Sequence, residues 1–399
     1  MYPTPRTKSL VVSLIAAALL LCSVIANAGP AKNVILMIGD GMSYEQVKAG
    51  SYYLSGATGN LSFEPYYKCG VTTYSANASI TDSAAAATAI ATGYKVNNGV
   101  ISQSPTGNPY QTILEKAKAL GKRTGLLTTV PITHATPAAF GAHEASRNSY
   151  INIGDDYLNS SRPEMILGGG DPAKGGSSYF SSSQVTTAQS LGYQVAYDYS
   201  QMSAWDPASV NRALGLFAGT YMTYEYDRQP SNTEPHLSQM TAKALAIANS
   251  DPDGFFLMIE GGMIDQAAHS NHIARTTREA VEFHNSVQTV LNWMQGRSDT
   301  LLIVTGDHET GGLTATNQGA GNYPTATWTT TGHTAANVPL YITGSNANLI
   351  DSYIQGGVAD NTDVFKVMGA ALVIPEPSSL LVFVCGLGGW AGIIWRGKR

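Results

Sequence analysis

Uninterrupted apolar runs of strand length recur along the chain and alternate with stretches of helical periodicity. Strands that are buried on both faces of a sheet have this pattern, because helices cover both sides of the sheet. The predicted strands cover residues 33–38, 124–130, 254–259, 301–305 and 338–343, and the clearest helical patterns cover residues 111–119 and 237–248. We therefore predict an α/β fold, a three-layer sandwich whose central and largely parallel sheet is flanked by helices.

One long segment departs from this alternation. Residues 148–235 are rich in Ser, Gly, Asn and Tyr and show little periodicity. Such a segment is typical of loops and irregular structure. We expect it to be a peripheral elaboration, so that residues 29–373 form one domain.

The low content of charged residues and of cysteine limits the binding partners and the covalent cross-links that this protein can have. Of the 399 residues, 43% are hydrophobic and only 13% are charged, whereas about a quarter are charged in an average soluble domain. The net charge is -5 and no basic stretch is spread along the chain, so we exclude nucleic acid as a partner. Between the two terminal segments Cys69 is the single cysteine, and the fold therefore has to rely on its core rather than on disulfides.

The first residues have the layout of an export signal. Arg6 and Lys8 precede an apolar run over residues 10–25, and the Ala-Asn-Ala triplet at residues 26–28 resembles a cleavage site. A retained membrane helix is the alternative, but the apolar run is short for a span and ends in small residues. We predict a signal peptide over residues 1–28 and an exported protein, periplasmic or extracellular.

The last residues combine a Pro-Glu-Pro triad at residues 375–377, an apolar stretch over residues 380–395 and a basic end. This order resembles the PEP-CTERM sorting signal of Gram-negative bacteria, which implies a transient inner-membrane anchor that an exosortase cleaves. The basic end would stay on the cytoplasmic side and leave the main domain outside. An ordinary C-terminal anchor is the alternative. We predict that residues 374–399 form this sorting and transmembrane segment.

Polar side chains gather just past the carboxyl ends of four predicted strands. These ends form the crevice in which open α/β sheets bind ligands, so clusters far apart in the sequence can meet there. In chain order the clusters are Asp40, then His134 and Thr136, then Glu260 and Asp265, then Asp307 and His308. Four carboxylates would repel one another unless cations neutralise them. Imidazoles with carboxylates suit zinc, and a hydroxyl with carboxylates suits magnesium, so the clusters predict more than one kind of metal site.

The spacing within two clusters agrees with this prediction. Asp265 and His269 are four residues apart, so they share one face if a helix begins at Asp265. Asp307 and His308 are adjacent and would point apart on a strand. We therefore expect a turn that the freedom of Gly306 allows.

A serine at a predicted helix start supplies a candidate nucleophile. In the segment TDSAAAATAIATG, Asp82 and Ser83 precede a run of small residues. The free N–H groups and the dipole at a helix N-terminus favour an anion. An N-cap is the commoner role for a serine in this place. The small residues, however, would let the helix pack tightly beneath a serine that carries substrate.

Six motifs together resemble those of the alkaline phosphatases, in the same order and with similar spacing. They are ILMIGDGM, TDSAAAATAIATGYK, ITHATPAAFGAHEASR, GFFLMIEGGMIDQAAH, IVTGDHETGG and WTTTGHT, within residues 33–343. The resemblance is to bacterial members that lack the large insertions of the mammalian enzymes. It implies an alkaline phosphatase-like fold and the hydrolysis of small-molecule phosphate monoesters to inorganic phosphate. It also raises the expectation of a homodimer, on which the residues themselves give no information.

The resemblance implies a role for each candidate residue. A first zinc would bind Asp265, His269 and His333; a second zinc would bind Asp40, Asp307, His308 and Ser83; a third ion, usually magnesium, would bind Asp40, Thr136 and Glu260. Ser83 would be the nucleophile that forms a phosphoserine, which water then hydrolyses. Arg147 would clamp two phosphoryl oxygens.

Two positions depart from parts of the family. His134 stands beside the third ion where some bacterial members have an acidic residue, and imidazole favours zinc over magnesium there. Gln266 occupies a position where other members have Lys, His or Trp. We expect a supporting or core role for His143, and structural or surface roles for His236, His272 and His284.

Two alternative functions remain. One is a phosphodiesterase of the same superfamily, and the other is a matrix-associated protein that kept the scaffold without catalysis. The second is disfavoured because no motif residue is missing. A sulfatase is disfavoured because alanines follow Ser83 where its motif requires Pro and Arg.

The C-terminal segment generates the first prediction. Protein isolated from its native host should end near residue 374, because cleavage close to the Pro-Glu-Pro triad would remove the apolar stretch and the basic end. Intact mass spectrometry measures this directly. A mass that includes Arg399 would reject the sorting signal.

Overall fold

The computed structural model describes residues 30–373. The predicted signal peptide (residues 1–28) and sorting segment (residues 374–399) lie outside the described residues. Within residues 30–373, no helix combines the length and the apolar character needed to cross a membrane.

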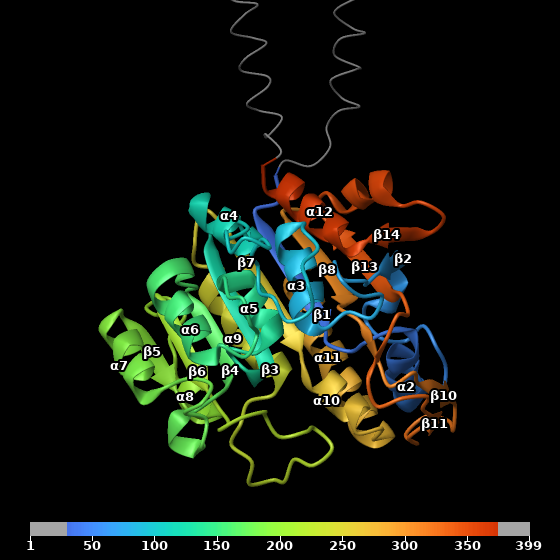
Figure 1. Cartoon of the computed structure of the whole chain (residues 1–399). Coiled ribbons are helices and arrows are strands. Elements are labelled where there is room, and N and C mark those ends of the chain that lie inside the picture. Colours follow the sequence, from blue (N-terminus) through green and yellow to red (C-terminus); the bar gives the residue numbers. More distant parts are fainter. Residues whose placement is uncertain (1–29, 374–399) are drawn as a thin grey trace, which may run out of the picture.

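A ten-stranded sheet forms the middle layer of the molecule (Figure 1), in the order β14-β2-β13-β8-β1-β7-β3-β4-β6-β5. In the described sheet, β13 runs antiparallel to both neighbours and the other strands are parallel to one another. In sheet order the strands are β14 Val358–Asp360, β2 Tyr67–Thr72, β13 Val338–Gly344, β8 Thr300–Gly306, β1 Asn33–Gly39, β7 Phe255–Gly261, β3 Arg123–Pro131, β4 Met165–Gly169, β6 Arg212–Leu216 and β5 Tyr193–Ala196.

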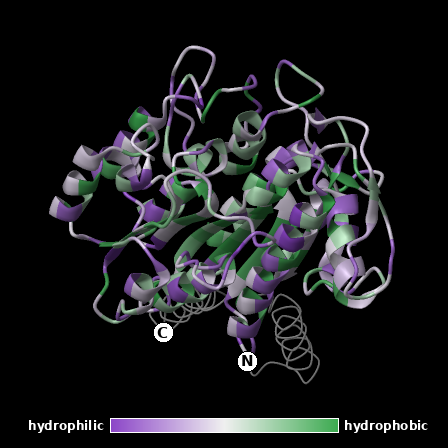
Figure 2. Ribbon diagram, turned by 90° about the horizontal axis from the view of Figure 1, so that it is seen from below, coloured by the Kyte–Doolittle hydropathy of each residue, from purple (hydrophilic) through white to green (hydrophobic). Residues whose placement is uncertain are grey.

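The helices lie on both faces of this sheet, and both interfaces are apolar (Figure 2). One face carries α3 Ser83–Thr92, α4 Ile113–Ala119, α5 Ala135–Gly141 and α12 Asn361–Val373; the other carries α2 Tyr44–Ser55, α9 Leu237–Ala248 and α11 Ile273–Trp293. Alternate residues of β1 enter opposite cores, with Leu36 in the first and Met37 in the second. The predicted α/β sandwich with a largely parallel sheet is confirmed.

The strongest apolar runs of the sequence became the centre of the sheet. The five predicted strands are β1, β3, β7, β8 and β13, within one or two residues at each end. The predicted helix at residues 237–248 is α9, whereas α4 begins at Ile113 rather than at residue 111. Thr112 caps α4, because its hydroxyl accepts from Glu115 N while the Glu115 carboxylate accepts from Thr112 N.

The segment over residues 148–235 contains more regular structure than its composition predicted. It forms α6 Tyr150–Asp156, α7 Ser182–Ser190 and α8 Tyr199–Ser203, and its strands β4, β6 and β5 extend the sheet beyond β3. Glycines interrupt the apolar pattern of β4 and β6 in the sequence. A Cβ on Gly169, for example, would lie 1.9 Å from the carbonyl oxygen of Thr220, so close backbone packing excludes an apolar side chain at that position.

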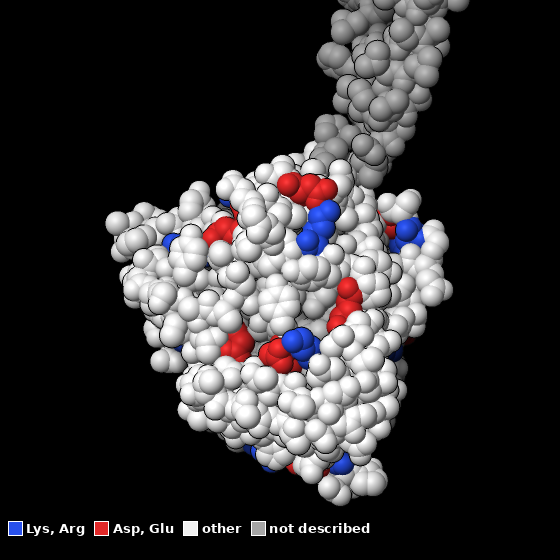
Figure 3. All heavy atoms as spheres, turned by 90° about the vertical axis from the view of Figure 1, so that its right-hand side faces the viewer, with Lys and Arg blue, Asp and Glu red and all other residues white. Residues whose placement is uncertain are grey.

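Charged side chains are sparse on the surface of the molecule. On the face drawn in Figure 3 most of the surface is uncharged, and acidic and basic groups mostly lie beside one another. Among the ion pairs of the described residues, Lys95 lies 3.2 Å from Asp360 and Lys68 lies 2.5 Å from Asp351. This face therefore has no broad basic surface of the kind that binds a nucleic-acid backbone.

Three central strands end at the same level of the sheet, so the polar residues that follow them lie at one edge. Gly39 of β1 pairs in register with Gly261 of β7 on one side and with Gly306 of β8 on the other. The chain bends at Asp307, directly after Gly306, although the backbone of Gly306 itself is not in the left-handed region. Its Cβ would lie 2.1 Å from the carbonyl oxygen of Met42, and the missing side chain lets the chain after β1 cross the end of β8.

The close approach at Gly306 generates a prediction about stability. Gly306→Ala should lower the free energy of unfolding by about 1–3 kcal/mol, because the Met42 backbone has to move to admit a methyl group. Urea unfolding monitored by circular dichroism measures the change. Gly369→Ala is the matched control, since Gly369 lies in α12 with no atom within 4 Å of the added Cβ, and it should be neutral or stabilising by up to about 1 kcal/mol. Equal stability of the two variants would contradict this account of Gly306.

Candidate active site

The carboxyl edge of the sheet brings the predicted site residues together from distant parts of the chain. Because β13 is antiparallel, the segment that precedes it, with β12 His333–Thr334, reaches the same edge. Asp40 follows β1, His134 and Thr136 follow β3, Glu260 lies in β7, α10 Met263–His269 follows β7, and Asp307 and His308 follow β8. Ser83 reaches the edge at the start of α3, after β2.

These side chains form three groups whose oxygen or nitrogen atoms lie within 4.8 Å of one another. The first metal group is Asp265, His269 and His333; the second is Asp40, Asp307 and His308; the third is Asp40, His134 and Glu260. Asp40 belongs to both the second and the third group. The first two groups hold the carboxylates and histidines that the family resemblance assigned to one ion each, whereas the resemblance assigned Thr136, not His134, to the third.

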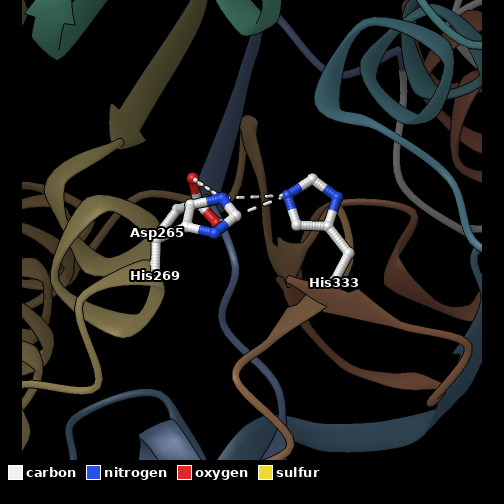
Figure 4. Close-up of side chains that lie close together, drawn as sticks. All are labelled: Asp265, His269 and His333. Carbon is white, nitrogen blue, oxygen red and sulfur yellow. Dashed lines mark hydrogen bonds and ion pairs between the residues drawn. The ribbon is translucent and has the colours of Figure 1, made fainter. Parts of the chain in front are cut away.

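In the first group, two imidazole nitrogens and a carboxylate point at one another (Figure 4). His269 Nε2 lies 3.2 Å from Asp265 Oδ2 and 3.2 Å from His333 Nε2. Each Nδ1 faces a backbone carbonyl, Thr331 O at 2.5 Å from His269 and Thr81 O at 2.8 Å from His333. A neutral imidazole that donates through Nδ1 keeps its lone pair on Nε2. The hydrogen bond with Asp265 raises the pKa of His269 to about 9. When His269 loses that proton, the two Nε2 lone pairs converge beside Asp265, an arrangement that a cation satisfies.

The second group is fully buried and lacks hydrogen-bond donors on its inner side. Asp307 Oδ1 accepts from Gly41 N and from His308 N, at 3.0 and 2.9 Å. Asp307 Oδ2 and both oxygens of Asp40 have no hydrogen-bond partner among the described residues. Burial raises the pKa of Asp307 to about 8, and burial and then Asp307 raise that of Asp40. Unpartnered buried carboxylates cost free energy unless a cation binds them, so this group also fits a metal ion.

The third group shares this shortage of donors. Thr128 Oγ1 donates to Glu260 Oε2 at 2.5 Å, while Glu260 Oε1, His134 Nδ1 and Thr136 Oγ1 have no partner in the described structure. Burial and the charge of Arg147 lower the pKa of His134 to about 3, so its ring is neutral. Its Nε2 lies 3.3 Å from Arg147 Nη2. A neutral ring has one lone pair, so His134 can accept from Arg147 or bind an ion, but cannot do both.

Ser83 and Arg147 are placed by Asp82, a residue to which the sequence gave no role beyond opening the helix. Asp82 caps α3 by accepting from Ala85 N at 3.0 Å, and its other oxygen accepts from Arg147 Nη1, also at 3.0 Å. Ser83 is the first residue of α3, and its Oγ lies 3.1 Å from His308 Nε2. Ser83, the second group and the Arg147 guanidinium are therefore held in one site by the start of a buried helix.

The remaining histidines lie outside the three groups, and their contacts are structural. His143 bonds to Ser102 O and Glu115, His272 accepts from Arg275 N, and His284 accepts from Ser62 N. His236 bonds to Glu225 at 2.8 Å in a cluster with Glu282. Arg228 Nε lies 2.9 Å from Glu225 and neutralises it, so this cluster is an ion-pair network that needs no metal.

With this geometry in place, comparison with known proteins identifies the family. Residues 31–326 match the family model described as alkaline phosphatase. The chain belongs to the alkaline phosphatase family.

Individual relatives agree with this membership. Alkaline phosphatase 3 of Bacillus subtilis is 35% identical over 308 residues, which are 74% of this chain and 65% of that protein. The chain therefore covers just under two thirds of this relative's length. The cold-active alkaline phosphatase of a psychrophilic Shewanella is 30% identical, with a TM-score of 0.74 over 85% of this chain and 99% of that one. A variant of the enzyme from the Antarctic bacterium TAB5, with a histidine replaced by glutamate and Mg bound in its M3 site, is 26% identical, with a TM-score of 0.74 over 87% of this chain and 99% of that one.

The buried carboxylates generate a prediction for protein stripped of metal. Burial raises the pKa of Asp307 to about 8 and that of Glu260 to about 7, against about 4 in an unfolded chain. A carboxyl whose folded-state pKa is raised contributes its full stability below pH of about 4 and loses it as the pH rises through 7 and 8. The thermal midpoint of chelated protein should therefore fall between pH 5 and about 8.5.

Two comparisons test this interpretation. With saturating zinc the fall should disappear over the same pH range, because the ion keeps the carboxylates ionised and paired. Asp307→Asn, measured without metal, should show a shallower fall, because one raised pKa is gone. Parallel curves for chelated and zinc-saturated protein would contradict a metal site at these carboxylates.

Proposed function

We propose that this protein hydrolyses phosphate monoesters through a phosphoserine at Ser83, with two zinc ions and a third ion that is magnesium or zinc. The observation that carries the proposal is the position of the Ser83 hydroxyl. It starts a buried helix, it touches His308 of the second group at 3.1 Å, and Asp82 holds Arg147 beside it. Family membership supports the same reaction class.

The chain's own groups can bind and orient a phosphoryl group. Arg147 uses one nitrogen on Asp82 and has further N–H groups free for a bidentate contact with two phosphoryl oxygens. The start of α3 adds backbone N–H groups and a favourable dipole for an anion. Ser83 Oγ then attacks phosphorus, the ester oxygen leaves as an alcohol, and water hydrolyses the phosphoserine to inorganic phosphate and free Ser83.

The three groups fit the ions that this reaction needs. Asp265, His269 and His333 offer a carboxylate and two imidazoles, which is a donor set for zinc, as are Asp40, Asp307 and His308. Zinc, when bound, would lower the pKa of the Ser83 hydroxyl and of water, and would offset negative charge on the leaving oxygen. The magnesium in the TAB5 variant supports a third ion of that kind here. The His134 ring would favour zinc at the third site only if it did not also accept a hydrogen bond from Arg147.

Export and anchoring belong to the same proposal. The two ends of the described chain lie together, since Ala31 N donates to Ala371 O at 2.8 Å. Ala31 precedes β1, so this contact is at the amino edge of the sheet, opposite the site. A membrane anchor within residues 374–399, before an exosortase cleaves it, would therefore leave the carboxyl edge open to soluble substrates.

Ser83→Ala is the test of the proposed chemistry. Without the nucleophile, the protein should lose covalent labelling by ³²P-labelled substrate after an acid quench. The value of kcat/KM should fall by on the order of 10³-fold or more, leaving only slow direct hydrolysis by water. Acid-stable phosphate on Ser83→Ala protein would rule out this nucleophile.

Arg147→Ala is the matched comparison and should behave differently. The variant keeps Ser83 and loses two charged hydrogen bonds worth about 1.5–3 kcal/mol each. Labelling should persist, while inhibition by inorganic phosphate should weaken by about 10-fold or more. The preference for a monoester over its diester should also shrink, because a diester has fewer free oxygens for the clamp. Unchanged phosphate inhibition would remove Arg147 from the proposed role.

A further inference from the structure

One hydroxyl group lies between the first and the second metal group. Thr310 belongs to β9 Glu309–Thr310 and is fully buried. Its Oγ1 lies 2.5 Å from Asp265 Oδ1, in the first group, and 3.3 Å from His308 Nδ1, in the second. No other role is apparent for this hydroxyl, since both of its contacts are to predicted metal ligands.

The direction of both hydrogen bonds follows from counting protons. A hydroxyl has one proton to donate, and an ionised carboxylate can only accept. The short contact to Asp265 Oδ1 therefore uses the Thr310 proton, because two oxygen lone pairs would repel at that distance. The contact to His308 must then run the other way, with Nδ1–H donating to Thr310 Oγ1. With the proton of a neutral ring on Nδ1, the lone pair is on Nε2, the nitrogen that faces Asp40 and Asp307 at 3.4 and 3.2 Å.

The backbone holds Thr310 in this position from two sides. β9 pairs with β12 so that Thr310 lies opposite His333, the third member of the first group. Gln46 Nε2 donates to Thr310 O and to Glu309 Oε1, both at 2.9 Å. A Cβ on Gly41 would lie 2.9 Å from Thr310 Oγ1, so a glycine at that position leaves room for the hydroxyl between the groups.

We propose that Thr310 is a positioning residue that couples the two zinc groups, by fixing the Asp265 carboxylate for one ion and the His308 tautomer for the other. This inference rests on the proposal that both groups bind zinc. Without the hydroxyl, Asp265 would lose a charge-assisted hydrogen bond and His308 could turn its proton to Nε2. Each change removes one ligand from one ion, so a single substitution should weaken both sites.

Zinc binding to metal-free protein tests the proposal without any substrate. Thr310→Val keeps the shape and removes the hydroxyl, and it should weaken zinc binding at both groups by about 10- to 100-fold, as measured by competition with a chromophoric chelator. Thr310→Ser restores the hydroxyl and should bind within about threefold of the natural protein. Thr241→Val is the control, since it deletes a buried threonine hydroxyl that contacts Leu237 O and Ser286, away from the site. Zinc affinities of Thr310→Val equal to those of the control would overturn the proposal, and a loss at one group alone would overturn the coupling.

The tautomer of His308 gives a second measurement that needs no substitution. In ¹⁵N NMR spectra of the metal-free natural protein, recorded at a pH where the His308 ring is neutral, its proton should be on Nδ1. A proton on Nε2 would overturn the proposal, even if Thr310→Val failed to fold. Neither experiment measures turnover. A protein that binds zinc as described but forms no phosphoserine would therefore contradict the proposed function and leave the role of Thr310 intact.

Discussion

The structure depends on one electrostatic constraint, the burial of four carboxylates at a single edge of the sheet. Asp40, Glu260, Asp265 and Asp307 are all at most 2% exposed, and the guanidinium beside them, Arg147, is already paired with Asp82. Burial alone would raise the pKa values of such groups and favour their protonation. The folded arrangement is therefore stable at neutral pH in its ionised form only with cations, and the fold and the metal sites are parts of one equilibrium.

The hydrogen bonds around the site leave metal-ligand lone pairs facing its interior. The backbone carbonyls of Thr331 and Thr81 face Nδ1 of His269 and His333 and can accept a hydrogen bond from it. Backbone N–H groups donate to Asp307 Oδ1 but not to its Oδ2. What remains on the inside includes Asp307 Oδ2, Glu260 Oε1 and both oxygens of Asp40, which have no hydrogen-bond partner in the described structure. Hydrogen-bond partners outside the site fix the orientation of the metal ligands. The entropy lost by ordering these side chains is therefore lost during folding and not during ion binding.

Close approach of the backbone at the strand ends allows the four carboxylates to lie near one another. Gly39, Gly261 and Gly306 end three neighbouring strands at one level, and the small residues of α3 allow that buried helix to bring Ser83 to the same edge. A larger side chain at Gly41 or Gly306 would meet atoms at 2.9 Å or closer. The glycines therefore set how near the carboxylates can approach, and this spacing defines sites that one ion can fill.

The sequence by itself determined the central strands, the α/β class and the residue types of the site, because continuous apolar runs and the polar clusters behind them are local patterns. It did not reveal the short strands β4, β5 and β6, which extend the sheet because β4 pairs with β3, β6 with β4 and β5 with β6. Nor did it assign Thr310, Thr128 or Asp82, since a hydroxyl or a carboxylate gains such a role only from the atom it faces. Tertiary structure alone decided those contacts, because their partners are between 45 and 132 residues away in the chain, and no periodicity of the sequence extends over such distances.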